Sequence, residues 1–205
     1  MSRFRRGVGV LLVLMVVCGI AIDASASWPP RKGQVFPDDI TYIDQDGNKL
    51  KISRFKGKVL FVEYVGMNCP ACQAFSGANS VGPYRNNPVQ GGLQSIETYF
   101  PRYASGIRLS DPRIVFVQIL LYDMNLKAPA PADATAWAEH FGMHTNRQQY
   151  VLVPLRDMRS PASFNLIPGF QLIDRRLRVL SDSTGHRPQD DLWRTLLPMV
   201  PKLLQ

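Results

Sequence analysis

The chain of 205 residues carries a net charge of +8 and contains 45% hydrophobic residues, 15 glycines, 16 prolines and three cysteines. This composition excludes collagen-like, low-complexity and disulfide-scaffold proteins, and the length indicates one globular domain. The basic residues form no run of five or more, so we interpret them as a solvated surface and expect no nucleic-acid partner.

The N-terminus has the pattern of a secretory signal peptide. Arg3, Arg5 and Arg6 precede an apolar run at residues 8–22, and an Ala-Ser-Ala site ends at Ala26. Because the run is shorter than the ~20 residues of a spanning helix, we expect cleavage after Ala26 and no stable membrane insertion afterwards. The pair Arg5-Arg6 keeps the twin-arginine route open beside the general secretory route. The mature chain, 27–205, is therefore predicted in the periplasm or outside the cell, where conditions are oxidising.

The first elements after the signal peptide predict strands. An extended lead-in at 27–39 is followed by a predicted hairpin, because Asp46-Gly47 favours a tight turn between the segments 40–43 and 49–52. After a short helical turn at 53–55, the almost continuously apolar segment 59–65 predicts a central strand buried on both faces.

The rest of the chain alternates helices and strands. The predicted order is helix 69–78, loop 79–92, helix 93–101, strand 114–121, helix 133–141, strands 150–153, 169–173 and 178–180, and helix 192–203. We expect Asp133 to cap its helix, Gly142 to stop it, and Pro101 to end the helix before it. Pro198 and Pro201 are expected to bend the last helix. The alternation predicts an α/β fold with a mixed sheet flanked by helices.

The candidate site is the sequence Cys69-Pro70-Ala71-Cys72, which opens a helix directly after the buried strand. At a helix N-terminus, unpaired N–H groups and the helix dipole stabilise the thiolate of the first cysteine. The second cysteine lies one turn further on, so it can attack a mixed disulfide formed by the first. We therefore predict Cys69 as the nucleophile and Cys72 as the resolving thiol.

Two other interpretations of the cysteine pair are an inert disulfide and a zinc or copper site. Structural zinc needs four ligands, and the chain has no second cysteine pair. His140 and His144 are four residues apart, but Gly142 is expected to end the helix between them. We expect surface or capping roles for both histidines, and no metal.

Residues 36–174 resemble the thioredoxin superfamily, specifically its exported TlpA/ResA-type, redoxin-like branch. The segment 46–72 is similar to that branch in its Asp-Gly pair, Phe-Lys-Gly-Lys, apolar strand and Cys-x-x-Cys. The segment 167–174, Ile-Pro-Gly-Phe-Gln-Leu-Ile-Asp, is similar to the part in which a cis proline precedes a strand. The resemblance covers neither the C-terminal thirty residues nor an insert at about 79–112.

The resemblance implies a thioredoxin-like fold and an exported thiol–disulfide oxidoreductase. Such an enzyme exchanges disulfides with protein substrates through a Cys69–Cys72 disulfide and needs no cofactor, because the dithiol carries two electrons. Its partners are a thiol or disulfide substrate and an unidentified redox partner; cytochrome maturation is possible by analogy with this branch. Pro70-Ala71 is neither the Gly-Pro of thioredoxin nor the Pro-His of strong oxidants, so reductase, oxidase and isomerase stay open.

The resemblance also implies roles for residues outside the cysteine motif. Pro168 corresponds to the cis proline, and Ile167 before it is expected to offer a backbone edge to a substrate peptide. Glu63, six residues before Cys69, falls where thioredoxin has a buried aspartate, which suggests proton transfer with Cys72. A trans Pro168 and a water-facing Glu63 are the alternatives. The remaining expected substrate contacts flank the first cysteine: Asn68, Pro70 and Ala71.

Two other functions of related proteins are kept as alternatives. A peroxiredoxin-like peroxidase needs Thr or Ser three residues before its cysteine, and Gly66 stands there before Cys69. A Sco-like copper-binding protein, or metallochaperone, uses Cys-x-x-x-Cys and a histidine near the later proline. Here the spacing is Cys-x-x-Cys, and His144 lies more than twenty residues before Ile167.

Overall fold

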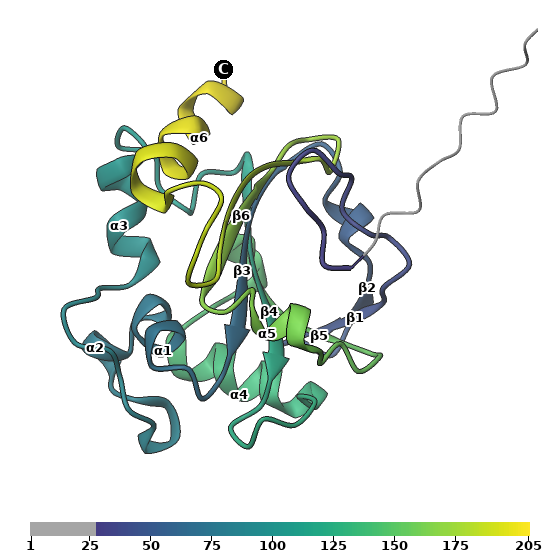
Figure 1. Cartoon of the computed structure of the whole chain (residues 1–205), viewed down its shortest axis with the longest axis vertical. Coiled ribbons are helices and arrows are strands. Elements are labelled where there is room, and N and C mark those ends of the chain that lie inside the picture. The colour runs from purple at the N-terminus through teal and green to yellow at the C-terminus, as the bar shows by residue number, and fades with distance from the viewer. Residues whose placement is uncertain (1–27) are drawn as a thin grey trace, which may run out of the picture.

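The computed structural model describes residues 28–205, so the predicted signal peptide and its cleavage site lie outside the described residues. These residues form a seven-stranded sheet in the order β2-β1-β5-β4-β3-β6-β7 (Figure 1). The strands are β1 (Tyr42–Asp44), β2 (Lys49–Leu50), β3 (Val59–Gly66), β4 (Ile114–Tyr122), β5 (Gln149–Pro154), β6 (Gly169–Ile173) and β7 (Val179–Thr184). β3, β4 and β5 are parallel, and the other pairings are antiparallel, which confirms the predicted mixed sheet.

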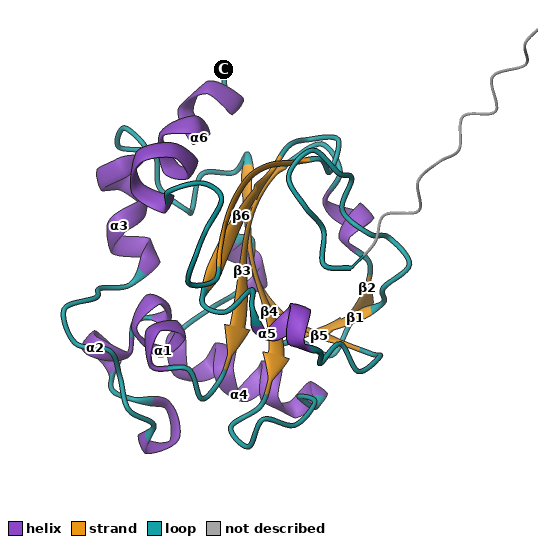
Figure 2. Cartoon of the chain, in the orientation of Figure 1, coloured by secondary structure: helices purple, strands orange, loops and turns teal. Residues whose placement is uncertain are grey.

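Helices surround this sheet (Figure 2). They are α1 (Pro70–Ser76), α2 (Ala78–Val81), α3 (Ile96–Tyr103), α4 (Pro131–Phe141), α5 (Pro161–Phe164) and α6 (Leu197–Leu203), with single turns η1 (Ile52–Phe55), η2 (Tyr84–Asn86) and η3 (Thr145–Arg147). The segment η4 (Leu192–Leu196) is a π-helix that runs directly into α6. Within residues 28–205, no helix has the length and apolar character needed to cross a membrane.

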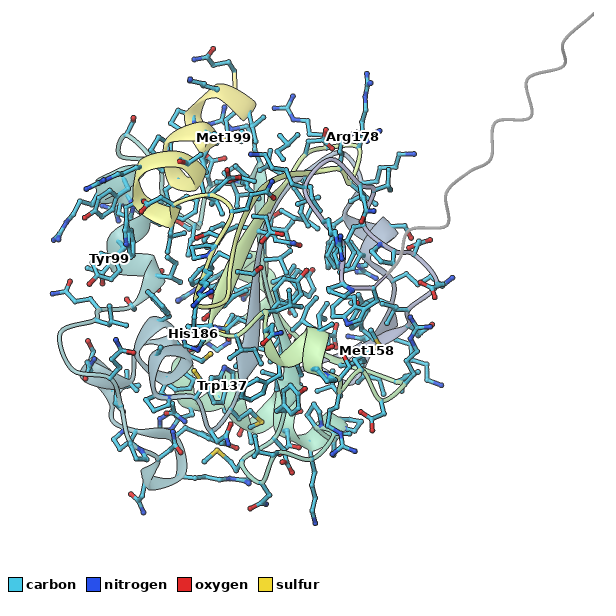
Figure 3. The ribbon with its side chains drawn as sticks, in the orientation of Figure 1. Tyr99, Trp137, Met158, Arg178, His186 and Met199 are labelled. Atoms are coloured by element: carbon cyan, nitrogen blue, oxygen red, sulfur yellow. The ribbon has the colours of Figure 1, made fainter. Side chains whose placement is uncertain are left out.

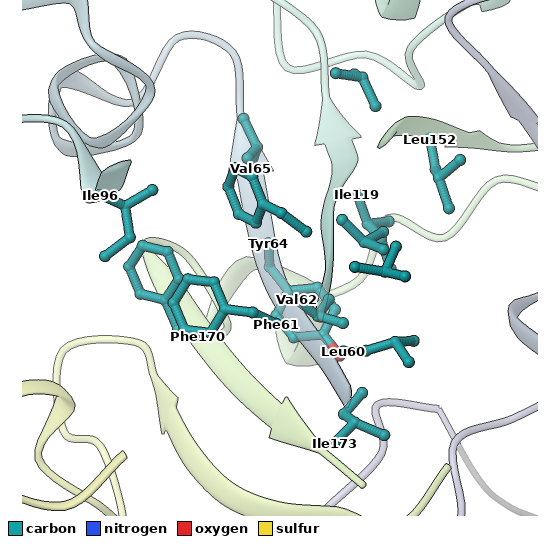
Figure 4. Close-up of a cluster of buried hydrophobic side chains, with 14 of the residues drawn as sticks. Leu60, Phe61, Val62, Tyr64, Val65, Ile96, Ile119, Leu152, Phe170 and Ile173 are labelled. Atoms are coloured by element: carbon teal, nitrogen blue, oxygen red, sulfur yellow. The ribbon is translucent and has the colours of Figure 1, made fainter. Parts of the chain in front are cut away.

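β3 is the centre of the core because all its residues are buried and apolar side chains point to both faces. On one face, Phe61 stacks on Phe170 of β6 at 5.1 Å and meets Phe100 of α3 edge-on at 5.1 Å (Figure 4). On the other face, Trp28 packs edge-on against Tyr64 at 5.8 Å. The N-terminal segment therefore covers the face opposite α3, and β3 is held from both sides.

Two expectations about helix ends are wrong. α3 continues past Pro101 to Tyr103, because Phe100 is fully buried against the sheet and Tyr103 packs on Trp193, so contacts on both sides of the proline hold the helix. The N-cap of α4 is Ala130, not Asp133, whose Oδ2 instead accepts from the Ala130 N–H at 2.8 Å. Gly142 ends α4 at a φ of 67°, as predicted.

Three other expectations need correction. The predicted loop 79–92 contains most of α2 and all of η2, and β7 extends beyond residue 180 to Thr184. The sequence pattern missed α5, a single turn that Ser160 caps by accepting from Ser163 N at 3.0 Å. The last helix is interrupted beside Pro198, as expected: it changes from π to α geometry in the turn before the proline, whose ring cannot bond to the carbonyl of Arg194 four residues earlier.

Candidate functional site

The cysteine pair lies where β3 leaves the sheet and α1 begins. Cys69 is the N-cap of α1, and its backbone N–H donates to Gly66 O at 2.9 Å, which closes a tight turn after the strand. Pro70 occupies the first turn, where a missing N–H costs little. The backbone N–H of Cys72 donates to Cys69 Sγ at 3.5 Å, so the first sulfur takes the place of a capping oxygen.

The two thiols have opposite environments. Cys69 is partly exposed, and the pKa of its thiol is lowered to about 6, chiefly by the hydrogen bond between its sulfur and the Cys72 side chain. Backbone N–H groups at the start of α1 and the charge of His186 lower it further. Cys72 is fully buried, and this burial raises the pKa of its thiol well above the usual value. The burial agrees with the expected roles, which stay predictions.

Both cysteines are free thiols in this structure. The structure therefore describes the dithiol state of the pair. The Cys69–Cys72 disulfide implied by the resemblance stays a prediction.

A cleft of about 660 Å³ opens beside Cys69. All the residues expected to contact substrate line it: Asn68, Pro70, Ala71 and Ile167. Pro168 lines it too, and its peptide bond with Ile167 is cis, as predicted. The structure thus brings two segments about 95 residues apart to one site, whereas Cys72 and Glu63 lie buried behind it.

Ile167 differs from its expectation in one respect. Its backbone N–H donates to Phe164 O at 3.2 Å, so this group is used within the chain and is not free to pair with a peptide. Its carbonyl oxygen accepts no hydrogen bond from the part of the chain that the structure describes. Its side chain is buried and would touch a Cβ placed on Gly66 at 3.4 Å. Any backbone pairing with substrate is therefore limited to the carbonyl.

Glu63 lies inside the sheet and not at a water-facing edge. It is fully buried in β3, opposite Gln118 of β4, whose Nε2 donates to Glu63 Oε2 at 2.7 Å. Oε1 has no hydrogen-bond partner among residues 28–205. Burial raises the pKa of Glu63 to about 8. The charge of Glu63 in turn raises the pKa of Cys72, so ionisation of the carboxyl makes the thiol harder to deprotonate.

Sequence reasoning missed His186, which lines the cleft and follows β7 (Figure 3). Gly185 places it there, because its N–H donates to Pro168 O at 3.0 Å and to Leu166 O at 3.1 Å. A Cβ on Gly185 would overlap Asn165 O, and its φ of 72° also favours glycine. The antiparallel pairing of β6 with β7 places Thr184 opposite Gly169. A prediction of this pairing from the sequence would have placed His186 near Pro168.

The walls of the cleft are mainly apolar and were also not predicted. They come from five separate parts of the chain: Phe75, Leu93, Tyr122, Leu126, Phe164 and Trp193. Leu126 and Phe164 are 50% and 55% exposed, so the apolar lining reaches the surface. Trp193 packs on Tyr99 of α3 at 4.6 Å. The insert and the C-terminal segment, which had no predicted role, thus build one wall together.

The histidines considered as metal ligands lie elsewhere. His140 Nε2 is 3.0 Å from Gly82 O, and neither His140 nor His144 lines the cleft. Within residues 28–205, no group of three or more His, Cys, Asp or Glu side chains is arranged to hold a metal ion. His186 is the histidine that affects the cysteine pair, because its charge lowers the pKa of Cys69.

No protein-family model matches the chain, and no curated protein matches its sequence. Solved structures do match. A SCO1/SenC family lipoprotein from Bacillus anthracis is 15% identical with a TM-score of 0.50, over 85% of this chain and 95% of that chain. The Sco family cytochrome c oxidase assembly protein BsSco is 13% identical with a TM-score of 0.50, over 84% and 92%. The thioredoxin domain of a thiol-disulfide oxidoreductase from Bacteroides vulgatus is 17% identical with a TM-score of 0.46, over 80% and 94%.

At these identities the matches concern the fold and not the activity. In this chain the cysteine pair follows the central strand β3 of the mixed sheet, and Pro168 directly precedes the neighbouring antiparallel strand β6. The mixed sheet flanked by helices, together with the two matches at a TM-score of 0.50, shows the thioredoxin-like fold that the sequence predicts.

Proposed function

We propose that the protein is an exported thiol–disulfide oxidoreductase of the TlpA/ResA-like kind, which exchanges disulfides with protein substrates. The observation that carries the proposal is the contrast between the two thiols of α1. Cys69 borders an open cleft with a pKa lowered to about 6, whereas burial raises the pKa of Cys72. An accessible thiolate at neutral pH is a nucleophile, and a protonated buried thiol is held back until the first attack has occurred.

In the reducing direction, the Cys69 thiolate attacks a substrate disulfide. A bond forms between Cys69 Sγ and one substrate sulfur, the substrate S–S bond breaks, and the other substrate sulfur leaves as a thiolate. Cys72 then loses its proton and attacks Cys69 Sγ, which forms the Cys69–Cys72 disulfide and releases the second substrate thiolate. A redox partner that carries a dithiol returns the pair to the dithiol state. The oxidising direction is the reverse.

Glu63 is the proposed acceptor of the Cys72 proton. It is the buried carboxyl on the strand that leads into the motif, and burial raises its pKa to about 8. A base with this pKa is partly ionised near neutral pH and can take a proton from a neighbouring thiol, then return it in the reverse step. The hydrogen bond from Gln118 lowers the pKa of Glu63, against the effect of burial, and so stabilises the ionised carboxylate.

The exposed apolar walls of the cleft suit an extended peptide with apolar side chains beside its cysteine. Leu126 and Phe164 offer this contact at the rim, and Ile167 O offers a hydrogen-bond acceptor inside. Disulfide exchange needs such a peptide to lie across the Cys69 sulfur. A folded or partly folded protein with an accessible disulfide is therefore the proposed substrate class.

The test is reduction of insulin by the dithiol protein, together with the reduction potential of the pair. We expect the wild type to exchange disulfides and Cys69→Ser to be inactive. A potential near that of thioredoxin, about −270 mV, favours a reductase, whereas one near −120 mV favours an oxidant. Absence of exchange with both insulin and a small disulfide would reject the proposal.

Export follows from the pattern of the first 26 residues. We propose that the mature protein begins at Ser27 and acts in the periplasm or outside the cell. Intact-mass measurement on material recovered from the periplasm or the medium tests the cleavage. A chain that retains the apolar run would contradict it.

A Sco-like copper protein is the second candidate, because His186 lies at the same cleft as Cys69. In that case Cys69, Cys72 and His186 would have to move together on binding copper, because the described residues hold no three such side chains in an arrangement that fits a metal ion. Equilibrium titration with Cu(I) and Cu(II) tests it, and a His186-dependent stoichiometric site without disulfide exchange would replace the first proposal. Disulfide exchange that is independent of copper would exclude this alternative as the main function.

A further inference from the structure

A buried polar network lies behind the cysteine pair. Gln118 Nε2 donates to Glu63 Oε2 at 2.7 Å and to Ser76 Oγ of α1 at 2.8 Å. Trp137 Nε1 of α4 donates to Gln118 Oε1 at 2.8 Å. Glu63, Gln118 and Trp137 are fully buried. Because these three side chains have no exposed surface, the hydrogen bonds that they make are made within the protein.

The indole of Trp137 fixes the direction of this network. An indole N–H can only donate, so the atom of Gln118 that faces it must be the carbonyl oxygen. The amide NH₂ of Gln118 must then face Glu63, where it can donate but not accept. Oε2 of Glu63 is thereby held as an acceptor. When Glu63 is neutral, its proton is left to Oε1, which has no partner among the described residues.

We propose that Trp137 is a positioning residue which, through Gln118, sets the oxygen on which Glu63 carries its proton and how readily the carboxyl releases it. Without the indole N–H, the Gln118 amide is free to turn by half a rotation. Its carbonyl oxygen can then accept a hydrogen bond from a protonated Oε2. That bond stabilises the neutral acid and makes Glu63 a poorer acceptor for the Cys72 proton. The link to Cys72 rests on the proposed function, but the orientation of the amide does not.

The groups around Glu63 are few. The titratable ones are two thiols: the charge of Cys69 raises the pKa of Glu63, and the charge of Glu63 raises the pKa of Cys72. β4 and α4 contribute the uncharged Gln118 and Trp137, and β6 places Phe170 opposite Glu63 in the register. Replacing Trp137 therefore alters the hydrogen bonding of the Glu63 carboxyl through the Gln118 amide and adds no charge near it.

The test is a titration of Glu63 by carboxyl carbon NMR in the dithiol protein labelled at glutamate. The chain has three glutamates, and Glu97 and Glu139 are exposed, so these two serve as internal standards. We expect Trp137→Phe to raise the titration midpoint of Glu63 by about one pH unit, since exchanging a hydrogen bond of the ionised form for one of the neutral form has this order of effect. The midpoints of Glu97 and Glu139 should not move.

The matched control is Trp28→Phe, which also removes an indole N–H bonded to a side-chain oxygen, Ser163 Oγ at 2.9 Å, but on the opposite face of the sheet. It should leave the Glu63 midpoint unchanged. If Trp137→Phe does not fold, replacement of Trp137 by 3-benzothienylalanine keeps the bicyclic shape and removes only the N–H. The same upward shift is expected.

A fall in the Glu63 midpoint would show that Trp137 acts by keeping water out, because water lowers the pKa of a buried carboxyl. An unchanged midpoint would show that the indole does not orient the amide. Either result overturns the inference. The titration needs no turnover, so a protein without disulfide exchange would reject the proposed function and leave this result standing.

Discussion

The two sides of α1 at the cysteine pair differ in almost every physical respect. On the open side, Cys69 borders a 660 Å³ cleft with apolar walls, and the pKa of its thiol is lowered to about 6. On the closed side, Cys72 is fully buried and within reach of the charge of Glu63, and the pKa of its thiol is raised. The difference teaches that one helical turn is enough to give identical side chains opposite properties, because surroundings and not residue type decide their proton affinity.

The largest effect is expected when the thiol on the closed side, Cys72, is removed. Cys72→Ser should leave Cys69 able to attack but remove the group that releases the substrate, so we expect turnover to fall by at least about 1000-fold while mixed disulfides accumulate. Non-reducing electrophoresis and mass spectrometry of the trapped complexes measure this. If Cys72 alone is alkylated at neutral pH in the wild type, the two roles are reversed.

The second prediction uses the lowered pKa of Cys69. The reactive thiolate gains population as pH rises through about 6, so alkylation by iodoacetamide should become about tenfold faster between pH 5 and pH 7 and then level off. Mass spectrometry of the modified peptide follows the rate. In Cys72→Ala, which has no side-chain donor, the midpoint should move upward, because the hydrogen bond from the Cys72 side chain is the largest cause of the shift. A wild-type midpoint near 8.5 would contradict the open-side assignment.

The third prediction tests the carboxyl of the closed side. Glu63→Gln should slow the resolving step several-fold and leave the first attack by Cys69 less affected, because only Cys72 needs to lose a proton. Single-turnover stopped-flow measurements with a fluorescent disulfide separate the two steps. Glu97→Gln, an exposed change of the same kind, is the control. Equal rates for wild type and variant in both steps would remove the proton role.

The smallest expected effect concerns His186 on the open side. Its charge is one of the weaker causes that lower the pKa of Cys69, so His186→Gln should raise the alkylation midpoint by only a few tenths of a pH unit. His144→Gln, outside the cleft, should not change it. A shift of a full unit would mean that the histidine, and not the hydrogen bond from Cys72, is the main group that stabilises the thiolate.

The parts of the fold that the sequence predicted well depend on local patterns. β3 was predicted to within one residue because an almost unbroken apolar run of that length is typical of a strand buried on both faces. The bounds of β6 were predicted without error, since Pro168 and Asp174 bracket it. The cysteine pair and Glu63 belong to the same continuous segment, and the expected relation between them came from the resemblance to thioredoxin at that position.

The parts that were missed depend on contacts between distant segments. His186 reaches the cleft through the pairing of β7 with β6, and Phe164 belongs to a single helical turn too short to leave a periodic pattern. The use of the Ile167 N–H by Phe164 O was missed for the second of these reasons, because this local bond closes the same short turn. Pro101 was misread because a proline rule describes an isolated helix, whereas packing of Phe100 and Tyr103 decides the length of α3.

The position of Trp193 has a practical consequence. This indole borders the same cleft as Cys69, while Trp28 lies on the opposite face of the sheet and Trp137 is sealed in the core. A disulfide quenches the emission of an indole beside it, so closing the Cys69–Cys72 bond should dim the Trp193 signal. Trp193 fluorescence should therefore report, without an added dye, whether the proposed Cys69–Cys72 disulfide is open or closed.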